Sequence, residues 1–219
     1  MKTIGLLHTV PSVLATFGDR LRSAMPGVEL LIHNTMDTFL ASDANIHGFT
    51  RENLNRLFFL LKALELEHPD VIVVTCSTLT PHVEQIRPFI STPVVAIDDA
   101  MASQAVRKGE RITVLATAYS TIGPTTTKLR SEASKIGRTL ELQEIVCDEA
   151  YTAIKKLDQE THDRIVKEAA ASIKNRDAIV LAQASMAHLE REIETLAGIP
   201  TFSSPDLCVT QVKDLLEGK

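Results

Sequence analysis

The sequence predicts an α/β protein built from two similar lobes, each with a parallel sheet, and three observations lead to this prediction. Short apolar runs alternate with longer segments of helical periodicity, as expected of parallel strands covered by helices. The same order of runs occurs twice along the 219 residues. Matching residues of the two occurrences are separated by an almost constant number of positions, which indicates two halves of one design.

In the first half, four apolar runs have the length and composition of buried strands, at 3–8, 28–33, 70–75 and 93–97. Helices are expected at 11–24, with Pro11 near the first turn, and at 50–67, where leucines recur on one helical face. Another helix begins near Thr78. The polar segment 34–49 is expected to be a loop that closes over a binding site.

The second half repeats this order. ITVLAT at 112–117 matches IGLLHT at 4–9, and DAIVLAQASM at 177–186 matches DVIVVTCSTL at 70–79. The second match continues without a gap, so that Pro93 aligns with Pro200 and Asp99 with Asp206. We therefore expect a first lobe of residues 1–98 plus 201–219 and a second lobe of residues 99–200. A cleft is expected between the carboxyl ends of their strands, where parallel sheets usually bind ligands.

The composition narrows the classes of function. A net charge of -5 argues against a nucleic-acid binder, which would carry a basic face. No run reaches the roughly 18 apolar residues that a membrane-spanning helix needs. Neither a glycine-rich phosphate loop nor a metal-spaced His/Cys cluster occurs, so we expect no cofactor and no metal. The prediction is a cytoplasmic protein that binds neither nucleic acid nor membrane.

Cys76 is the cysteine whose position points most clearly to chemistry. Free cysteine often packs simply as a small hydrophobic residue. Cys76, however, ends an apolar run and stands just before a helix, whose positive dipole end should lower the pKa of the thiol. We interpret it as a reactive thiol. Cys147 and Cys208 are expected to be packing residues, and three widely spaced cysteines do not suggest a disulfide framework.

Hydroxyl side chains gather at the ends of four predicted strands. The segments concerned are 8–11, 75–78, 117–120 and 182–185. Backbone N–H groups at a helix start, with Ser and Thr beside them, suit a small carboxylate. The same residue types also cap helices, so capping and binding both remain open for Ser77, Thr78 and Ser185.

These segments resemble a known family. TCST at 75–78, ATAYST at 116–121 and LAQASM at 181–186 are similar to the aspartate/glutamate/hydantoin racemase superfamily, which includes arylmalonate decarboxylase and maleate isomerase. The resemblance covers nearly the full chain. It implies duplicated halves of the flavodoxin or Rossmann type, catalysis without a cofactor, and one catalytic residue from each half.

The resemblance also implies site residues. Cys76 would be the catalytic thiol of the first half, and Gln183 stands at the second catalytic position. The residues implied around a substrate carboxylate are Ser77, Thr78, Thr117, Tyr119 and Ser120. The strand-end segments add His8, Thr9, Thr75, Ala184 and Ser185 as candidate binding residues. The expected partner is a small carboxylate substrate, and the family analogy allows a homodimer.

The sequence departs from the family at Gln183, where racemases have a second cysteine. Racemisation usually needs a base on one face of the carbon and an acid on the other. A glutamine side chain forms hydrogen bonds but does not exchange a proton at neutral pH. The symmetric two-thiol mechanism is therefore not available to this chain.

Three alternatives remain open from the sequence. The first is a racemase acting at the α-carbon of an amino acid or hydantoin, with Cys76 and a second group such as His8, Asp37 or His47. The second is a one-thiol enzyme, either an arylmalonate-type decarboxylase or a maleate-type isomerase. The third is a protein that binds a small carboxylate without turnover. The thiol and its neighbouring hydroxyls are intact, which favours an enzyme.

Overall fold

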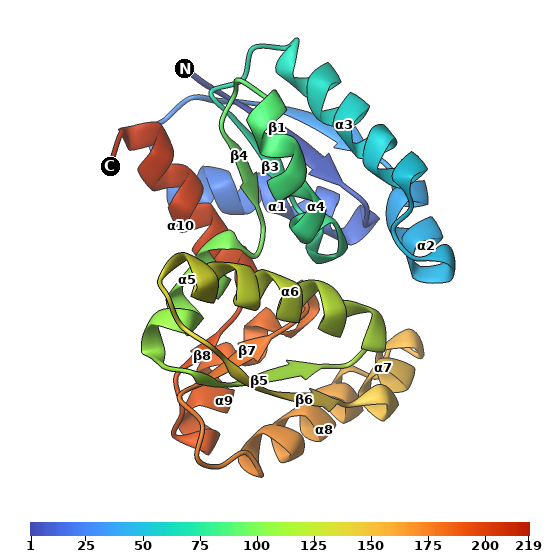
Figure 1. Cartoon of the computed structure of the whole chain (residues 1–219), viewed down its shortest axis with the longest axis vertical. Helices are drawn as coiled ribbons and strands as arrows, with labels where there is room; N and C mark the ends of the chain where they lie inside the picture. The colour runs from blue at the N-terminus through green and yellow to red at the C-terminus, as the bar shows by residue number, and fades with distance from the viewer. The chain divides into compact units, whose positions relative to one another are not determined.

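The computed structural model describes residues Met1–Lys219 and contains two parallel sheets of four strands each. The strand orders, β2-β1-β3-β4 and β6-β5-β7-β8, are the same in the two sheets (Figure 1). The prediction of two similar parallel-sheet lobes is therefore confirmed. The strands are β1 (Lys2–His8), β2 (Leu30–Met36), β3 (Val71–Val74), β4 (Val94–Ala96), β5 (Arg111–Ala116), β6 (Glu141–Val146), β7 (Ala178–Leu181) and β8 (Thr201–Phe202).

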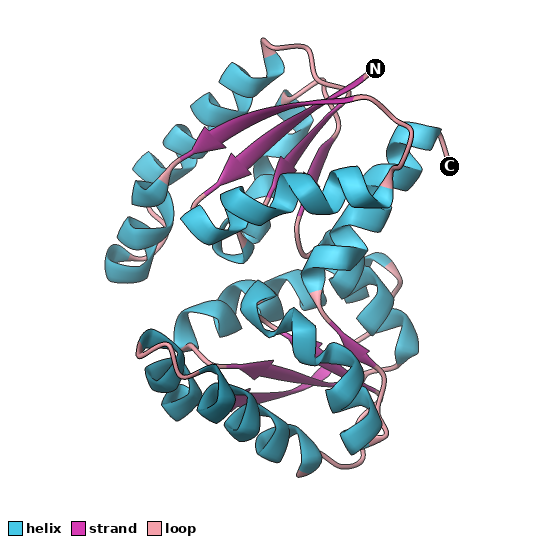
Figure 2. Ribbon diagram, turned by 180° about the vertical axis from the view of Figure 1, so that it is seen from behind, coloured by secondary structure: helices cyan, strands magenta, loops and turns pink.

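Helices connect the strands and flank each sheet (Figure 2). The α-helices are α1 (Pro11–Ala24), α2 (Thr38–His47), α3 (Arg51–Glu65), α4 (Thr80–Ile86), α5 (Asp99–Lys108), α6 (Tyr119–Lys135), α7 (Asp148–Lys155), α8 (Gln159–Ala171), α9 (Glu190–Ala197) and α10 (Ser204–Glu217). Three short 3-10 helices are η1 (Ser77–Leu79), η2 (Arg87–Phe89) and η3 (Ala184–Leu189). None of the helices combines the length and the apolar character needed to cross a membrane.

The first sheet is buried on both faces, which explains its nearly continuous apolar strands. Ile4 and Leu6 of β1 belong to a core that also contains residues of α1 and α10. Leu7, the next residue of the same strand, belongs to a second core with residues of α3 and α4. Successive side chains of a strand point to opposite faces, so both positions must be apolar.

Strand pairing explains the repeat in the sequence. Ile4 of β1 lies opposite Val71 of β3, and Ile112 of β5 lies opposite Ala178 of β7. The shift that aligns the two halves of the sequence therefore also aligns their hydrogen-bonded strand partners. Because the strands keep the same register, residues that follow corresponding strands reach corresponding places in the two lobes.

The chain forms two compact units, Met1–Ile97 with Asp206–Lys219, and Asp98–Pro205. Helix α5 follows the first sheet in the chain but packs on β7 and β8 of the second. Helix α10 follows the second sheet, yet its Cys208 belongs to the core of the first. The sequence boundary assigned all of 201–219 to the first lobe, whereas Thr201 and Phe202 form β8 and pair with β7.

The segment 34–49 is not the loop that the sequence predicts. Strand β2 continues to Met36, and helix α2 follows almost at once. The carboxylate of Asp37 caps this helix by accepting a hydrogen bond from the backbone N–H of Leu40 at 3.0 Å. Gly48 ends it with a φ of 75°, a conformation that glycine adopts without strain. The capping contacts at the two ends of α2 therefore stabilise a helix where the polar composition alone predicts a loop.

At the amino end of each sheet, an aspartate carboxylate links two neighbouring strands by accepting a backbone hydrogen bond, a contact that we call an aspartate clasp. Asp70 precedes β3 and accepts a hydrogen bond from the backbone N–H of Thr3 at 2.7 Å. Asp177 precedes β7 and accepts from the backbone N–H of Arg111 at 2.9 Å and from its guanidinium at 2.8 Å. A Cβ atom at Gly109 would lie 2.3 Å from the Asp177 carboxylate, so only glycine fits beside this clasp.

Candidate functional site

His8 and Thr75 end neighbouring strands of the first sheet and contact each other through buried side chains. His8 Nδ1 lies 2.8 Å from Thr75 Oγ1, and the same hydroxyl lies 3.1 Å from the carbonyl oxygen of Leu7. The direction of the hydrogen bond between His8 and Thr75 depends on which ring nitrogen carries the proton.

His8 is held as a neutral imidazole. Burial lowers its pKa, although the hydrogen bond with Asn34 opposes that change. Nε2 lies 3.0 Å from Asn34 Oδ1, a carbonyl oxygen that can only accept, so Nε2 carries the proton and donates to it. Nδ1 of the neutral ring then accepts from the hydroxyl of Thr75. Both ring nitrogens are therefore engaged within the lobe. His8 shapes the end of the sheet and has no nitrogen left over to act as a base.

The thiol of Cys76 lies at the same edge, directly after β3 and at the start of η1. Its residue is 8% exposed. Thr9, which follows β1, places its hydroxyl beside the thiol. This hydroxyl is itself buried and has no other hydrogen-bond partner. The first lobe thus presents a thiol and a hydroxyl whose partner is that thiol, at the carboxyl end of its two central strands.

The structure reverses the expected direction of the Cys76 pKa shift. Burial raises the pKa, and this effect exceeds the lowering by hydrogen bonds from Thr9, from Thr78 and from the backbone N–H of Leu79. The expectation of a lowered pKa was wrong because the dipole of a short helix contributes less than desolvation of the thiolate. Cys76 at rest is a thiol that carries its proton.

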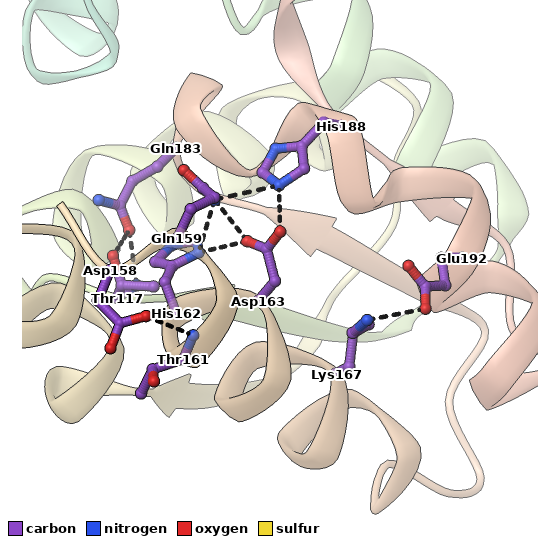
Figure 3. A network of polar contacts seen from close by, with 10 residues as sticks. All are labelled: Thr117, Asp158, Gln159, Thr161, His162, Asp163, Lys167, Gln183, His188 and Glu192. Carbon is purple, nitrogen blue, oxygen red and sulfur yellow. Dashed lines mark hydrogen bonds and ion pairs between the residues drawn. The ribbon is translucent and has the colours of Figure 1, made fainter.

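The corresponding edge of the second lobe holds Gln183 against Thr117 (Figure 3). The Gln183 oxygen Oε1 accepts two hydrogen bonds, from the backbone N–H of Thr117 at 2.6 Å and from its hydroxyl at 3.0 Å. By strand register, Thr117 corresponds to Thr9 and Gln183 to Cys76. Thr9 therefore contacts Cys76 in the first lobe as Thr117 contacts Gln183 in the second.

The remaining predicted site residues lie at these same edges. Ser77 and Thr78 form η1 and are half-buried, whereas Tyr119 and Ser120 open α6 and are exposed. Ala184 is half-buried and Ser185 exposed at the start of η3. Within each lobe, the structure brings the predicted residues to one end of the sheet. Hydrogen bonds connect Cys76 with Thr9, His8 with Thr75, and Gln183 with Thr117.

The other acid or base candidates have different surroundings. Asp37 is buried, caps α2 and forms an ion pair with Arg56 at 2.6 Å. His47 lies at the exposed end of α2, with 62% of its side chain accessible. Cys147 and Cys208 are buried, and burial raises the pKa of Cys147. These environments suit structural roles.

Sequence reasoning missed a polar cluster in the second lobe (Figure 3). Asp163 accepts hydrogen bonds from Gln159 Nε2 at 2.6 Å, His162 Nδ1 at 2.7 Å and His188 Nε2 at 2.9 Å. Burial opposes ionisation of Asp163, but these three donors together hold its pKa below the usual range. The only sequence signal was the spacing of His162 from Val166 on the buried face of α8, which suggests a buried polar residue.

Comparison with protein families gives a match over most of the chain. The model described as Asp/Glu/Hydantoin racemase matches residues 12–212. The chain belongs to the Asp/Glu/hydantoin racemase family. This membership supports an isomerase and confirms the resemblance carried by the strand-end motifs.

Individual relatives are distant. An uncharacterized protein of Schizosaccharomyces pombe is 26% identical over 152 residues, which cover 65% of this racemase-family chain and 61% of the relative. The match thus spans about three fifths of that relative's length.

Solved structures of similar fold include an aspartate racemase of Picrophilus torridus and an allantoin racemase of Klebsiella pneumoniae. The aspartate racemase has a TM-score of 0.71 at 18% identity, covering 98% of this chain and 94% of its own. The allantoin racemase has a TM-score of 0.67 at 18% identity, covering 99% of this chain and 88% of its own. At this identity the likeness concerns the fold.

Proposed function

We propose that this family member is a cofactor-independent isomerase that acts at the α-carbon of a small carboxylate, with Cys76 as the group that transfers the proton. The observation that carries the proposal is the buried thiol of Cys76 with the buried hydroxyl of Thr9 as a hydrogen-bond donor. Thr78 and the N–H of Leu79 complete the set of donors around the sulfur. These donors favour the thiolate, while burial favours the thiol.

The proposed chemistry needs the thiol in both protonation states. The thiolate removes the proton from the α-carbon, and the electron pair of the broken C–H bond moves toward the substrate carboxylate. A water molecule then protonates the opposite face of the carbon, and the hydroxide that this leaves takes the proton from the Cys76 thiol, which restores the thiolate and the water. The hydrogen bonds to sulfur from Thr9, Thr78 and Leu79 lower the cost of the thiolate, which burial would otherwise make large.

A second candidate is favoured by two specific observations. Cys76 holds its proton at rest, and Gln183 offers no second exchangeable proton. A decarboxylase needs only one proton donor. The bond from carbon to the leaving carboxylate breaks, its electron pair stays on the α-carbon, and the thiol proton goes to that carbon. Water then reprotonates the thiolate.

Proton exchange in heavy water, followed by NMR, tests the proposal. The protein is incubated with amino acids, hydantoins and aryl malonates. Deuterium at the α-carbon with inversion supports the isomerase, and loss of carbon dioxide supports the decarboxylase. If no member of the panel reacts although carboxylates bind, the protein is a binding protein and the proposal is wrong.

Two cysteine variants show whether the chemistry depends on the proposed thiol. Cys76→Ala is expected to lower turnover by about 10²-fold or more, the usual contribution of a positioned acid or base. Cys147→Ala, at a thiol that is also buried and also has a raised pKa, is the matched control. It should change turnover only a few-fold. Full activity of Cys76→Ala would remove the thiol from the mechanism.

A further inference from the structure

The first sheet carries a buried polar bridge at its carboxyl edge. The hydroxyl of Thr75 donates to His8 Nδ1 over 2.8 Å, and His8 Nε2 donates to Asn34 Oδ1 over 3.0 Å. His8 ends β1, Asn34 belongs to β2, and Thr75 directly follows β3. The imidazole therefore links three neighbouring strands through side chains, in addition to the backbone hydrogen bonds of the sheet. We call this set of contacts the His8 bridge.

The second lobe has the same backbone arrangement without such a bridge. By strand register, Ala116 corresponds to His8 and Ala182 to Thr75. The backbone N–H groups of Thr75 and Ala182 donate to the residues just before His8 and Ala116, at 3.0 and 2.9 Å respectively. Both alanines are buried. A sheet of this topology thus forms with two methyl groups at these positions, so the sheet itself does not need the bridge.

Burial of an imidazole has a cost that the sheet does not explain. His8 is fully buried, and burial lowers its pKa because the surroundings oppose a charge on the ring. Each of its nitrogens also needs a partner, since an unsatisfied buried polar group is destabilising. Two apolar side chains would fill the place without these requirements, as the alanines do in the second lobe. A polar bridge in one lobe alone points to a task that only this lobe has.

The residues next to the bridge carry the thiol and its hydrogen-bond donor. Thr9 follows His8, Cys76 follows Thr75, and the hydroxyl of Thr9 donates to the sulfur. On both strands, the bridge thus lies one residue before the groups that form this contact. A hydrogen bond restricts direction as well as distance, whereas apolar packing is not directional. The bridge therefore limits how far the two strand ends can shift against each other.

We infer that His8 is a positioning residue that, through Thr75, holds the thiol of Cys76 against its hydroxyl donor. His8 itself exchanges no proton, because both ring nitrogens are engaged within the lobe. The inference rests on the proposed function in one respect, since His8 affects turnover only if Cys76 transfers the proton. Its effect on the state of the thiol can be measured without any substrate.

An apolar replacement of the bridge separates positioning from stability. The double variant His8→Leu/Thr75→Val removes both polar partners and keeps side chains of similar volume, so the midpoint of urea unfolding should stay close to that of the wild type. The contact between Thr9 and the sulfur should weaken, and the pKa of Cys76 should rise further. Alkylation by iodoacetamide over a range of pH, with mass spectrometry of the Cys76 peptide, measures this pKa as the midpoint of the profile. The plateau at high pH reports the accessibility of the thiol separately.

Single variants keep the test decisive if the double variant does not fold. Thr75→Val alone removes the hydroxyl with little change of shape and should raise the pKa of Cys76 in the same direction. Thr75→Ser keeps the hydroxyl and should restore the wild-type pKa. Thr113→Val is the matched control, because the buried Thr113 hydroxyl donates to Gln143 of the neighbouring strand in the second lobe at 3.0 Å. It should lower stability to a similar extent and leave the pKa of Cys76 unchanged.

Turnover gives a second readout with any substrate that reacts. The double variant should lower kcat by about tenfold, since a misplacement of about 1 Å can cost about 10²-fold. KM should change little, because the buried ring of His8 acts through Thr75 and not on the substrate. An unchanged kcat in a variant whose thiol pKa has risen would overturn the inference.

The outcomes distinguish this inference from the proposed function. A wild-type pKa of Cys76 in the folded double variant would overturn the inference, as would an equal shift in Thr113→Val. If the pKa rises as expected but no substrate undergoes Cys76-dependent chemistry, the effect of His8 on the thiol stands and the proposed function fails. If that chemistry occurs and the double variant keeps both the thiol pKa and the full rate, the function stands and this inference fails.

Discussion

The two lobes are nearly identical at the amino ends of their sheets and differ at the carboxyl ends. Asp70 and Asp177 clasp the amino ends in the same way, each through a backbone N–H of the neighbouring strand. At the carboxyl ends, the first lobe has a thiol beside a hydroxyl that donates to it, whereas the second has a glutamine bonded to the corresponding threonine. The clasp links neighbouring strands in both sheets and involves neither Cys76 nor Gln183.

The difference between the carboxyl ends separates two kinds of task. A thiol can exchange a proton, and a glutamine can only donate and accept hydrogen bonds. Under the proposed function, the first lobe supplies the group that exchanges a proton, and the second lobe supplies hydrogen bonds alone. Four sets of variants test this contrast, from the largest expected effect to the smallest.

Gln183→Cys removes the contrast by giving the second lobe a proton-exchanging group. On a substrate that exchanges its α-proton, inversion should become faster relative to the wild type by about 10²-fold, the lower end of what a positioned acid or base contributes. Chiral chromatography after incubation in heavy water measures it. Gln183→Ser, which adds no exchangeable thiol, is the control. An equal rate of inversion in both variants would contradict the assigned roles.

Asp163→Asn tests a cluster that only the second lobe has. At the corresponding places, judged by the buried faces of α3 and α8, the first lobe has Asn53 and Leu54. The substitution removes a charged acceptor from three hydrogen bonds, one of them to buried His162. We expect a loss of about 2 kcal/mol in the free energy of unfolding. Urea unfolding measures this loss, and Arg164→Gln on the exposed side of α8 should change stability little.

The effect of Asp163→Asn should also depend on pH. The folded state holds the pKa of Asp163 below its usual range, so its contribution to stability is present above the pKa of the unfolded chain. It disappears as the pH falls through the lower pKa of the folded state. The free energy of unfolding of the variant should therefore differ most from that of the wild type at neutral pH and least in acid. If this difference were the same at every pH, the ionised carboxylate of Asp163 would not be the source of the lost stability.

Thr117→Val and Thr9→Val compare the two threonines directly. The Thr117 hydroxyl donates to Gln183, so its loss should cost about 1 kcal/mol of unfolding free energy. The Thr9 hydroxyl is buried without another partner, so replacing it with a methyl group should leave stability unchanged or slightly higher. The same change should raise the pKa of Cys76 further, measured as slower alkylation at a given pH. Equal destabilisation by both substitutions would contradict the difference between the two edges.

The smallest expected effect concerns the aspartate clasps, which the two lobes share. Hydrogen bonds from Arg111 lower the pKa of Asp177 to about 2, against an ordinary value of 3.8. Its carboxylate therefore contributes stability above about pH 4, and this contribution declines between pH 4 and pH 2. Asp177→Asn should make acid unfolding less steep, and Asp70→Asn should act in the same direction because the pKa of Asp70 is also lowered. Both groups are partly exposed, so the changes should be modest.

The sequence by itself determined the duplicated parallel sheets and the residues at their carboxyl ends. Buried strands need apolar residues on both faces, so they are visible as short continuous runs. The constant shift between the halves follows from the strand register. It aligned Gln183 with Cys76, so that these residues occupy corresponding positions in the two lobes. These properties are local or periodic, and periodicity can be read without coordinates.

Only the tertiary structure decided that Thr201 and Phe202 pair with the second sheet, that the pKa of Cys76 is raised, and how the Gln183 amide is oriented. Desolvation of a thiol depends on all the atoms that exclude water from it, and these come from many parts of the chain. The partner of Gln183 is the backbone of Thr117, which is 66 residues away in sequence. A hydrogen bond to a backbone N–H involves no particular side chain, so no residue pattern announces it, and it exists only once the strands are paired.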